Sequence, residues 1–282
     1  MSQAAVVGAG TMGNGIAHVF AQAGWSTTLI DVAPEALQQA LATIGANLDR
    51  QVRKGALTAE QKAQTLARIR TETSLAAVAG AELVIEAATE HPETKFEIFR
   101  NLDRHAAPAA IIGSNTSSIS ITAIAARTRR PAQVIGMHFM NPVPVMQLVE
   151  IIRGLETSDE TTRRVVEVSK ALGKVPVEVN DAPGFVSNRV LMPMINEAVF
   201  CVEQGVAAPE AIDTVMKLGM NHPLGPLALA DLIGLDVCLA ILEVLQRDLG
   251  EDKYRPAPLL RKMVAAGRLG RKSLRGFYEY GG

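Results

Sequence analysis

Hydrophobic and polar positions follow two different patterns along this chain. Up to about residue 180, short apolar runs such as AAVV and ELVIEAA alternate with longer segments in which apolar residues recur every three or four positions. The short runs predict strands and the longer segments predict helices, an alternation typical of a parallel sheet covered by helices. From Asp181 onward the pattern is almost entirely helical. The sequence therefore predicts an α/β fold, with a Rossmann-type, mostly parallel sheet in residues 1–183 and an all-helical C-terminal domain in residues 184–282.

Two interruptions of the alternation are expected within the first domain. One helix is predicted from Pro34 to about Lys54 and a second from Thr58, where Thr58 and Gln61 have the spacing of a capping box. Together these helices form an inserted helical hairpin. Further on, the apolar run VIGMHF is followed by the turn-like NPVP and a second apolar run, MQLVEII, with no room for a crossover helix. We therefore expect these two strands to be antiparallel.

Length, charge and cysteine content narrow the class of protein. At 282 residues the chain is long enough for two domains, and its net charge of -1 gives no electrostatic support for binding nucleic acid or an acidic membrane surface. Cys201 and Cys238 lie far apart in helical segments, which predicts buried thiols rather than a disulfide or a ligand pair. The N-terminus has no signal-peptide pattern, and no apolar run reaches the ~20 residues that span a bilayer. A cytoplasmic protein is expected.

A glycine-rich turn near the N-terminus predicts a dinucleotide site. Gly8, Gly10 and Gly13 match G-x-G-x-x-G between a predicted strand and helix, and Asp31 closes the next strand. The first glycine permits a tight turn, the second lets the backbone approach a pyrophosphate, and the third lets helix and strand pack closely. A carboxylate at Asp31 can accept hydrogen bonds from a ribose 2′-OH and repels a 2′-phosphate, which favours NAD over NADP. The alternative for Asp31 is a helix N-cap before Pro34.

Two further polar groupings are candidates for chemistry. If the chain folds back near Pro144, His138 and Glu150 lie opposite each other, as in a general base held in one tautomer by an acidic partner. The alternative is a buried histidine of the core. The run from Ser114 to Ser118 follows a predicted strand at its carboxyl end, where open α/β sheets bind ligands, although small polar residues are also common in turns.

Several longer runs carry a family resemblance. They are SNTSSISI, HFMNPVPVMQLVEII, PGFVSNRVL, HPLGPLALADLIGLD and RKSLRGFYEY. Across essentially the whole chain they resemble the L-3-hydroxyacyl-CoA dehydrogenase family, and the length is similar to that of its free-standing bacterial members. The resemblance implies reversible, NAD-dependent oxidation of a (3S)-3-hydroxyacyl-CoA, such as 3-hydroxybutyryl-CoA, to a 3-oxoacyl-CoA.

The resemblance also implies roles for individual residues. His138 matches the catalytic base and Glu150 its acidic partner, while Ser117 and Asn188 match the side chains that hold the substrate's oxygens. Because Asn188 belongs to the second domain, the resemblance implies a site between the domains. Met140 departs from the family pattern, which often has phenylalanine there. The positions implied to contact NAD are Gly8, Gly10, Thr11, Met12, Gly13, Asp31, Glu90, Lys95 and Asn115.

Basic residues near the tip of the predicted hairpin are candidates for binding coenzyme A. Arg50, Arg53 and Lys54 lie on one helical face, and the family uses this hairpin for CoA phosphates. The alternative is a solvated basic surface. The same alternative applies to a second basic group near the C-terminus, formed by Lys262, Arg268, Arg271 and Lys272.

The remaining expectations concern metals, partners and rival activities. The other histidines, His18, His91, His105 and His222, show no metal-ligand spacing with nearby acids or cysteines, so no metal is predicted. A mostly apolar stretch in the second domain, Pro223 to Leu242, indicates a homodimer interface. The sequence leaves the acyl group open. It also leaves two rival functions: a dehydrogenase of a small free hydroxy acid, and a catalytically silent nucleotide-binding protein.

Overall fold

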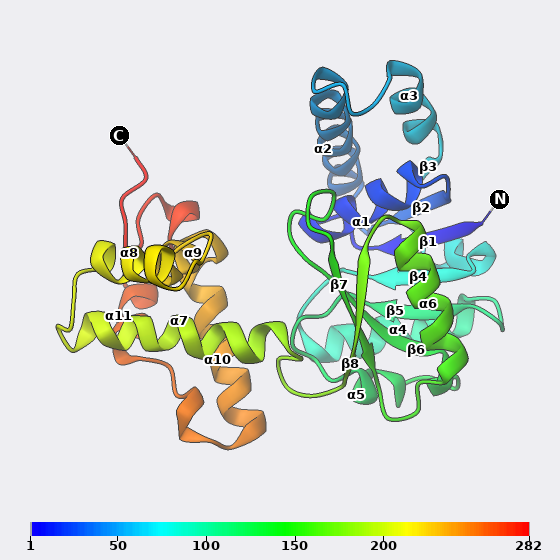
Figure 1. Ribbon diagram of the computed structural model, residues 1–282. Helices are drawn as coiled ribbons and strands as arrows, with labels where there is room; N and C mark the ends of the chain where they lie inside the picture. Colours follow the sequence, from blue (N-terminus) through cyan, green and yellow to red (C-terminus); the bar gives the residue numbers. More distant parts are fainter. Residues whose placement is uncertain (1, 282) are drawn as a thin grey trace. The chain divides into compact units, whose positions relative to one another are not determined.

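The computed structural model describes residues 2–281, and the chain divides into two compact units, Met1–Ala182 and Pro183–Gly282 (Figure 1). The first unit is built on an eight-stranded sheet with helices packed against it, and the second is formed by helices. The predicted fold class is therefore confirmed.

The sheet of the first unit has the strand order β3-β2-β1-β4-β5-β6-β7-β8. Neighbouring strands are parallel except at the contact between β6 and β7, which is antiparallel as the missing crossover helix predicted. The strands are β1 (Gln3–Val7), β2 (Ser26–Ile30), β3 (Ile69–Glu72), β4 (Leu83–Glu86), β5 (Ile111–Ser114), β6 (Val134–Phe139), β7 (Leu148–Arg153) and β8 (Val175–Asn180).

Six α-helices connect these strands. They are α1 (Thr11–Gln22), α2 (Pro34–Arg53), α3 (Ala59–Ala67), α4 (Pro92–His105), α5 (Ile121–Ala125) and α6 (Asp159–Ala171), with short 3-10 turns η1 (Leu75–Gly80) and η2 (Pro131–Gln133). The predicted hairpin is confirmed, because α2 and α3 pack against each other and against α1 (Figure 1). Thr58 caps α3 in the predicted capping box, with the Gln61 side chain accepting from the Thr58 N–H.

Strand β3 is the one element of the sheet that the sequence pattern did not predict. It lies at the edge of the sheet beside β2, and its residues Ile69, Arg70, Thr71 and Glu72 alternate between half-buried and exposed. An edge strand with one partner needs little apolar surface. The four residues therefore resemble a polar loop in sequence, and α2 and α3 form the crossover from β2 to β3.

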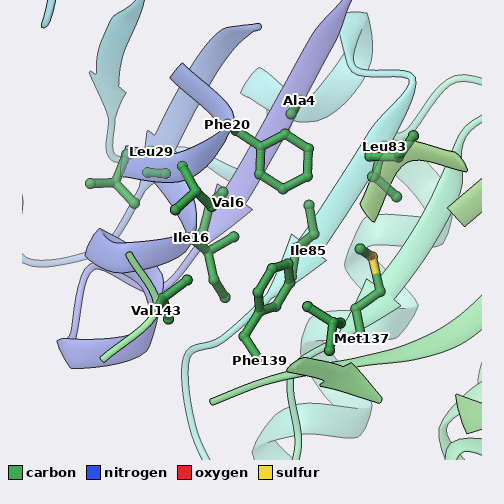
Figure 2. Packing of buried hydrophobic residues seen from close by; sticks show 14 of the residues in the cluster. Ala4, Val6, Ile16, Phe20, Leu29, Leu83, Ile85, Met137, Phe139 and Val143 are labelled. Carbon is green, nitrogen blue, oxygen red and sulfur yellow. The ribbon is translucent and has the colours of Figure 1, made fainter. Parts of the chain in front are cut away.

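The core of the first unit lies where α1 packs on the sheet (Figure 2). Ile16 and Phe20 of α1 are fully buried against β1, β2 and β4, and Phe139 at the end of β6 closes the cluster beside Val143. The ring of Phe20 meets Trp25 edge to face at 5.3 Å between centroids. Burying apolar side chains on this scale supplies most of the driving force for folding and leaves the ends of the strands at fixed positions.

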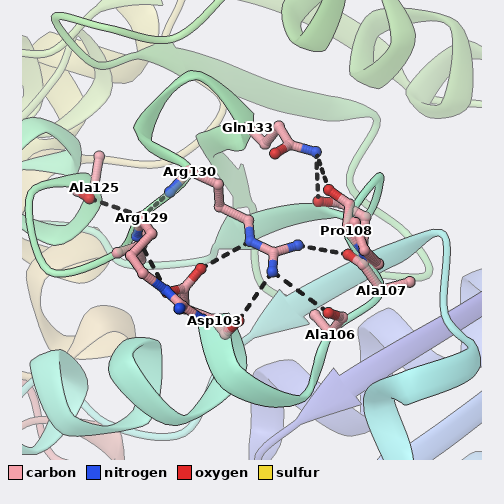
Figure 3. A network of polar contacts seen from close by, with 10 residues as sticks. Asp103, Ala106, Ala107, Pro108, Ala125, Arg129, Arg130 and Gln133 are labelled. Carbon is pink, nitrogen blue, oxygen red and sulfur yellow. Dashed lines mark hydrogen bonds and ion pairs between the residues drawn. The ribbon is translucent and has the colours of Figure 1, made fainter.

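A polar cluster fastens α4 to the segment before β6 (Figure 3). The carboxylate of Asp103, 6% exposed, accepts from the guanidinium groups of Arg129 at 3.0 Å and Arg130 at 2.8 Å. Arg130 also donates to the backbone carbonyl of Asp103 in the last turn of α4 and to those of Ala106 and Ala107 directly after it. Burial raises the pKa of Asp103, but the hydrogen bonds from Arg130 and Arg129 outweigh this and lower it overall.

The second unit is held together by two buried aspartates as well as by its apolar core. Asp231 accepts from the backbone N–H groups of Phe277 and Tyr278 and from the hydroxyl of Tyr280, all at 3.0 Å, which fixes the C-terminal segment. Asp213 likewise accepts from the N–H groups that begin α9 and from the hydroxyl of Tyr278. The helices of this unit are α7 (Ser187–Glu203), α8 (Pro209–Gly219), α9 (Pro226–Ile233), α10 (Leu235–Leu249) and α11 (Pro258–Ala265), with 3-10 turns η3 (Asp252–Tyr254) and η4 (Arg271–Ser273).

The two cysteines differ in their burial. Cys238 lies in the core of the second unit, where burial raises the pKa of its thiol to about 12 and makes it a poor nucleophile. Cys201 is a free thiol that is only half-buried, so the prediction of burial is confirmed for Cys238 alone. Within residues 2–281, no helix is both long and apolar enough to cross a membrane.

Candidate active site

The three fingerprint glycines lie between β1 and α1, and each meets a different environment. Gly8 has φ +99°, and a Cβ there would lie 2.6 Å from Ala87 O and from the Cα of Ala88. A Cβ on Gly13 would lie 1.7 Å from Gly8 O, so α1 can approach β1 only without that side chain. A Cβ on Gly10 would meet nothing within 4 Å. Folding therefore requires glycine at Gly8 and Gly13, whereas the space beside Gly10 fits a bound pyrophosphate.

The N-terminus of α1 is suited to binding an anion. The N-cap is Gly10, no side chain caps the helix, and its first turn contains no acidic residue. The first N–H groups of α1, including those of Thr11 and Met12, have no carbonyl partner within the helix, and they carry the positive end of the helix dipole. A groove of about 480 Å³ begins at this point and continues along α2. These features fit a dinucleotide cofactor.

Asp31 lies directly after β2, next to the glycine loop. Its carboxylate accepts from Ala9 N at 2.8 Å and from Ala33 N at 3.0 Å. The N-cap of α2 is Ala33, with no side-chain cap, so the alternative in which Asp31 caps that helix is wrong. A carboxylate can accept about four hydrogen bonds, which leaves capacity for a ribose hydroxyl. The expected ribose contact stays a prediction.

His138 and Glu150 pair across the antiparallel strands. The register places His138 of β6 directly opposite Glu150 of β7, as the position of the turn predicted. The Nδ1 of His138 donates to Glu150 Oε2 at 2.9 Å, with the two side chains 11% and 3% exposed. A carboxylate on Nδ1 fixes the neutral tautomer with Nε2 as the proton acceptor. The geometry is that of an oriented general base.

The loop after β5 holds the small polar residues that the sequence singled out. Asn115 Oδ1 accepts from Phe139 N at 2.9 Å, which joins this loop to the end of β6 beside His138. Glu90 accepts from Ser117 N at 3.0 Å and from the hydroxyl of Thr116 at 2.7 Å. The predicted residues Asn115, Ser117, Glu90 and His138 thus come from neighbouring strand ends at the carboxyl edge of the sheet.

A buried ion pair at the same edge was not recognised from the sequence. Lys95, assigned to NAD contact by resemblance, is 1% exposed, and its Nζ pairs with Oε2 of Glu86, which is 0% exposed. Ser114 also donates to Glu86 Oε2, at 2.9 Å. Glu86 ends the apolar run of β4, so its sequence context indicates only a strand end. The one available signal was a carboxylate at the last position of a fully buried strand.

The basic residues of the hairpin lie at the tip of α2. Arg50 and Arg53 are exposed in its last turn, and Lys54 is the C-cap residue. A second cavity, of about 280 Å³, is lined by Arg50 and Lys54 and by the connection between β6 and β7. Both cavities share Asn47, Pro142 and Pro144, so the groove from the glycine loop continues to these cations.

Residues 142–146 form one wall of this groove, and hydrogen bonds from a buried lysine hold them in place. The Nζ of Lys174, 8% exposed as a residue, donates to Val143 O at 2.5 Å and to Met146 O at 2.8 Å. A Cβ on Gly15 of α1 would lie 2.8 Å from Val143 Cβ, so this glycine permits the wall to approach α1. The groove is therefore set by the fold of the first unit.

The other predicted residues lie elsewhere. Asn188 is buried in the first turn of α7, in the second unit. Met140 is half-buried directly after β6. His91 caps α4 through Nδ1, which accepts from Thr94 N at 3.4 Å, and among residues 2–281 no cluster of three potential metal ligands occurs. The second basic group is exposed, and Lys272 pairs with Asp236 at 2.6 Å.

Two family models match the chain. The model of the 3-hydroxyacyl-CoA dehydrogenase NAD-binding domain matches residues 3–182. The model of the 3-hydroxyacyl-CoA dehydrogenase C-terminal domain matches residues 184–280.

Individual relatives are similar along nearly the whole length of this chain. A probable 3-hydroxybutyryl-CoA dehydrogenase of Bacillus subtilis is 57% identical, with 99% of this chain and 98% of the relative covered. A 3-hydroxyadipyl-CoA dehydrogenase of Escherichia coli is 44% identical and covers 98% of this chain, which spans 58% of that protein. The crystal structure of (S)-3-hydroxybutyryl-CoA dehydrogenase from Ralstonia eutropha superposes with a TM-score of 0.97 at 53% identity, covering 100% of both chains.

Proposed function

Because the chain belongs to the 3-hydroxyacyl-CoA dehydrogenase family, we propose that it oxidises (3S)-3-hydroxybutyryl-CoA reversibly to acetoacetyl-CoA. The chain is an NAD-dependent enzyme of this family, and its substrate is an acyl-CoA. The short acyl group is the proposed part, and the names of the relatives at 57% and 53% identity support it. The observation that carries the chemistry is the buried pair of His138 and Glu150 at the strand ends.

We propose that His138 is the general base. NAD⁺ supplies the hydride acceptor for C3 of the substrate. The Nε2 of His138 takes the proton of the 3-hydroxyl group, so the alcohol loses one hydride and one proton and becomes a ketone. Glu150 holds Nδ1–H at 2.9 Å, which orients the ring and stabilises the imidazolium that forms. In the reverse direction the same nitrogen returns the proton.

Ser117 and Asn188 are proposed to bind the substrate's oxygens. Glu90 holds the backbone of Ser117 at 3.0 Å and so fixes the loop that carries its hydroxyl. Asn188 offers an amide group that can donate to a carbonyl oxygen. The family resemblance supports both assignments.

The dinucleotide contacts are proposed for the residues around the glycine loop. The N–H groups of Thr11 and Met12 are suited to the pyrophosphate, and Asp31 is suited to the adenine ribose. The other proposed contact positions are Gly8, Gly10, Gly13, Glu90 and Asn115. Lys95, which the resemblance also assigned to NAD, is 1% exposed and pairs with Glu86, so we propose that it supports this set indirectly.

We further propose that coenzyme A occupies the far part of the groove, which is the cavity of about 280 Å³ between α2 and the β6–β7 connection. Its apolar wall suits the pantetheine arm, and Arg50 and Lys54 in its lining, with Arg53 in the same last turn of α2, suit the phosphates. Replacing both Arg53 and Lys54 by alanine should raise KM for acetoacetyl-CoA by about three- to tenfold. Turnover of free acetoacetate, the substrate class of the rival enzyme, should not change. Equal effects on both substrates would contradict the CoA assignment.

A chain-length series tests the proposed substrate. The rate of NADH oxidation would be followed by absorbance with C4, C6, C8 and C10 3-oxoacyl-CoA substrates and with 3-oxoadipyl-CoA. We expect the largest kcat/KM for the C4 compound. A higher value for 3-oxoadipyl-CoA would replace the butyryl proposal by one that matches the name of the Escherichia coli relative.

The surface of the second unit bears on the oligomeric state. Apolar side chains of the second unit are exposed on α8 and α9, among them Leu218 at 82% and Leu232 at 52%. Clusters of this kind are typical of interfaces between subunits, so we propose a homodimer, to be checked by light scattering after gel filtration. The cytoplasmic location expected from the sequence stays a prediction.

A further inference from the structure

One buried carboxylate contacts three segments of the chain at the carboxyl edge of the sheet. Glu86 is the last residue of β4 and is 0% exposed. Its Oε1 accepts from Ala88 N at 2.9 Å, and its Oε2 accepts from Ser114 Oγ at 2.9 Å and from Lys95 Nζ. Each contact comes from a different segment: the residues after β4, the end of β5 and the first turn of α4.

The first of these contacts reaches the glycine loop. Ala88 is held by Glu86, and Ala87 and Ala88 are the residues against which Gly8 packs, since a Cβ on Gly8 would lie 2.6 Å from both. A shift of Ala88 therefore moves the surface on which the glycine loop rests.

The second contact reaches the loop that carries Ser117. Ser114 Oγ donates to Glu86 and accepts from Thr116 N at 3.3 Å. Thr116 and Ser117 are in turn held by Glu90, which lies on the same loop as Ala88. The carboxylate of Glu86 thus closes a ring of hydrogen bonds that joins the loops after β4 and β5, and the glycine loop after β1 packs against this ring at Ala87 and Ala88.

Lys95 compensates the buried negative charge of Glu86. An isolated buried carboxylate loses its hydration, and a buried ammonium group does the same. A buried ion pair is a weak source of stability, because well-packed apolar residues often do as well, but removal of one partner leaves an uncompensated charge. The Glu86–Lys95 pair is therefore better explained by its effect on the orientation of the neighbouring loops than by a contribution to the stability of the fold.

We propose that Glu86 is a positioning residue for dinucleotide binding, that it sets the mutual placement of these three loops, and that Lys95 acts through it. Glu86 does not touch the reacting atoms in this role. The proposal concerns cofactor binding alone, so its test needs no acyl-CoA and is independent of the substrate proposed above.

The experiment is a double-variant cycle on the full chain. The variants are Glu86→Gln, Lys95→Met and the two combined, and the readouts are the Kd for NADH by isothermal titration calorimetry and the Tm of the protein without cofactor. Each single variant leaves one buried charge unpaired, so we expect both to weaken NADH binding by about tenfold and to lower Tm. The combined variant leaves no unpaired charge and should recover most of both losses.

Asp103→Asn is the matched control. Asp103 lies on the same helix as Lys95, is also buried in an ion pair and contacts none of the three loops (Figure 3). It should lower Tm and leave the Kd for NADH within about twofold of the wild-type value.

Three results would overturn the proposal. If Glu86→Gln binds NADH normally while the combined variant is as weak as Lys95→Met, the lysine contacts the dinucleotide directly. If Tm falls in both single variants without a change in Kd, the pair is only structural. Where a single variant does not fold, Ser114→Ala decides, because it breaks the ring without leaving a charge unpaired. Its expected loss is about threefold in NADH affinity, and an unchanged Kd would rule the positioning role out.

Discussion

His18 and His138 are two buried histidines of the first unit with different partners. His18, 0% exposed in α1, contacts the side-chain amides of Gln22 at 3.0 Å and Gln51 at 3.2 Å, and none of residues 2–281 gives a hydrogen bond to its Nδ1. His138 contacts the carboxylate of Glu150 at the carboxyl edge of the sheet. Burial lowers the pKa of His18, the hydrogen bond that its Nε2 donates to Gln22 Oε1 opposes this, and nearby Lys174 adds to the lowering.

The difference shows that burial alone does not identify a functional histidine. Neutral amides can hold an imidazole in place, as at His18, which joins α1 to α2. A carboxylate can in addition stabilise the imidazolium that forms when the ring accepts a proton. The partner and the position at the strand ends therefore distinguish the two histidines.

The largest effect is expected for His138→Gln. Loss of a general base should lower kcat by about 10² to 10⁴, with Tm nearly unchanged because glutamine can keep a hydrogen bond to Glu150. Stopped-flow or steady-state measurement of NADH absorbance checks the rate, and calorimetry checks Tm. Near-normal turnover would remove His138 from its proposed role and with it the contrast to His18.

Asp31→Ala tests whether a carboxylate that holds backbone N–H groups can also bind a ligand. Loss of a hydrogen bond from ribose to a charged group should raise KM for NAD⁺ by about tenfold or more. Removal of the charge should also improve the relative use of NADP⁺. The informative quantity is the ratio of kcat/KM for the two cofactors. If that ratio stays at the wild-type value, Asp31 serves only to fasten Ala9 and Ala33.

His18→Leu should affect stability and not catalysis. The substitution removes the contacts to Gln22 and Gln51 and should lower the free energy of unfolding by about 1 to 2 kcal/mol. Because His18 does not lie at the strand ends, kcat should stay within about twofold of the wild-type value. Urea titration measures the stability, and a fall in kcat by more than tenfold in the folded variant would contradict the comparison.

The smallest effect is expected in the pH dependence of stability. The pKa of His18 is lowered in the folded state, so the unfolded chain binds the proton more readily. Stability linked to His18 is therefore complete above the unfolded pKa of about 6.5 and is lost as the pH falls below it, until the folded group also protonates. Urea midpoints between pH 7.5 and 5 should fall more steeply for the wild type than for His18→Leu. Parallel curves would mean that His18 does not titrate on unfolding.

The local patterns of the sequence predicted much of the fold and part of the site. The glycine spacing predicted three different steric roles, and the environments of Gly8 and Gly13 agree with the turn and the close helix packing, while the role of Gly10 beside a pyrophosphate stays a prediction. The position of the turn predicted that His138 and Glu150 face each other. Both predictions depend on neighbours along the chain or across one hairpin, where spacing determines geometry.

Contacts between distant segments were not predictable in the same way. Glu86 was not singled out, and Lys95 was assigned only by resemblance, because their pairing depends on how α4 packs at the end of β4. Strand β3 has too few apolar residues to be recognised without its neighbour β2. The hydrogen bonds from Lys174 to Val143 O and Met146 O likewise form only when β8 pairs with β7. The periodicity of a sequence indicates which face of an element is buried and where the chain turns, but it does not indicate which distant residues will pair.

The distribution of aromatic residues gives each unit its own spectroscopic signal. Trp25, which meets Phe20 edge to face, is the single tryptophan of the chain and lies in the first unit, whereas the three tyrosines, Tyr254, Tyr278 and Tyr280, all lie in the second. Fluorescence excited at wavelengths that only indole absorbs therefore reports melting around α1, and near-ultraviolet tyrosine bands report release of the C-terminal segment from Asp231. The unmodified chain can thus reveal, without any label, whether its two halves denature in one step or in sequence.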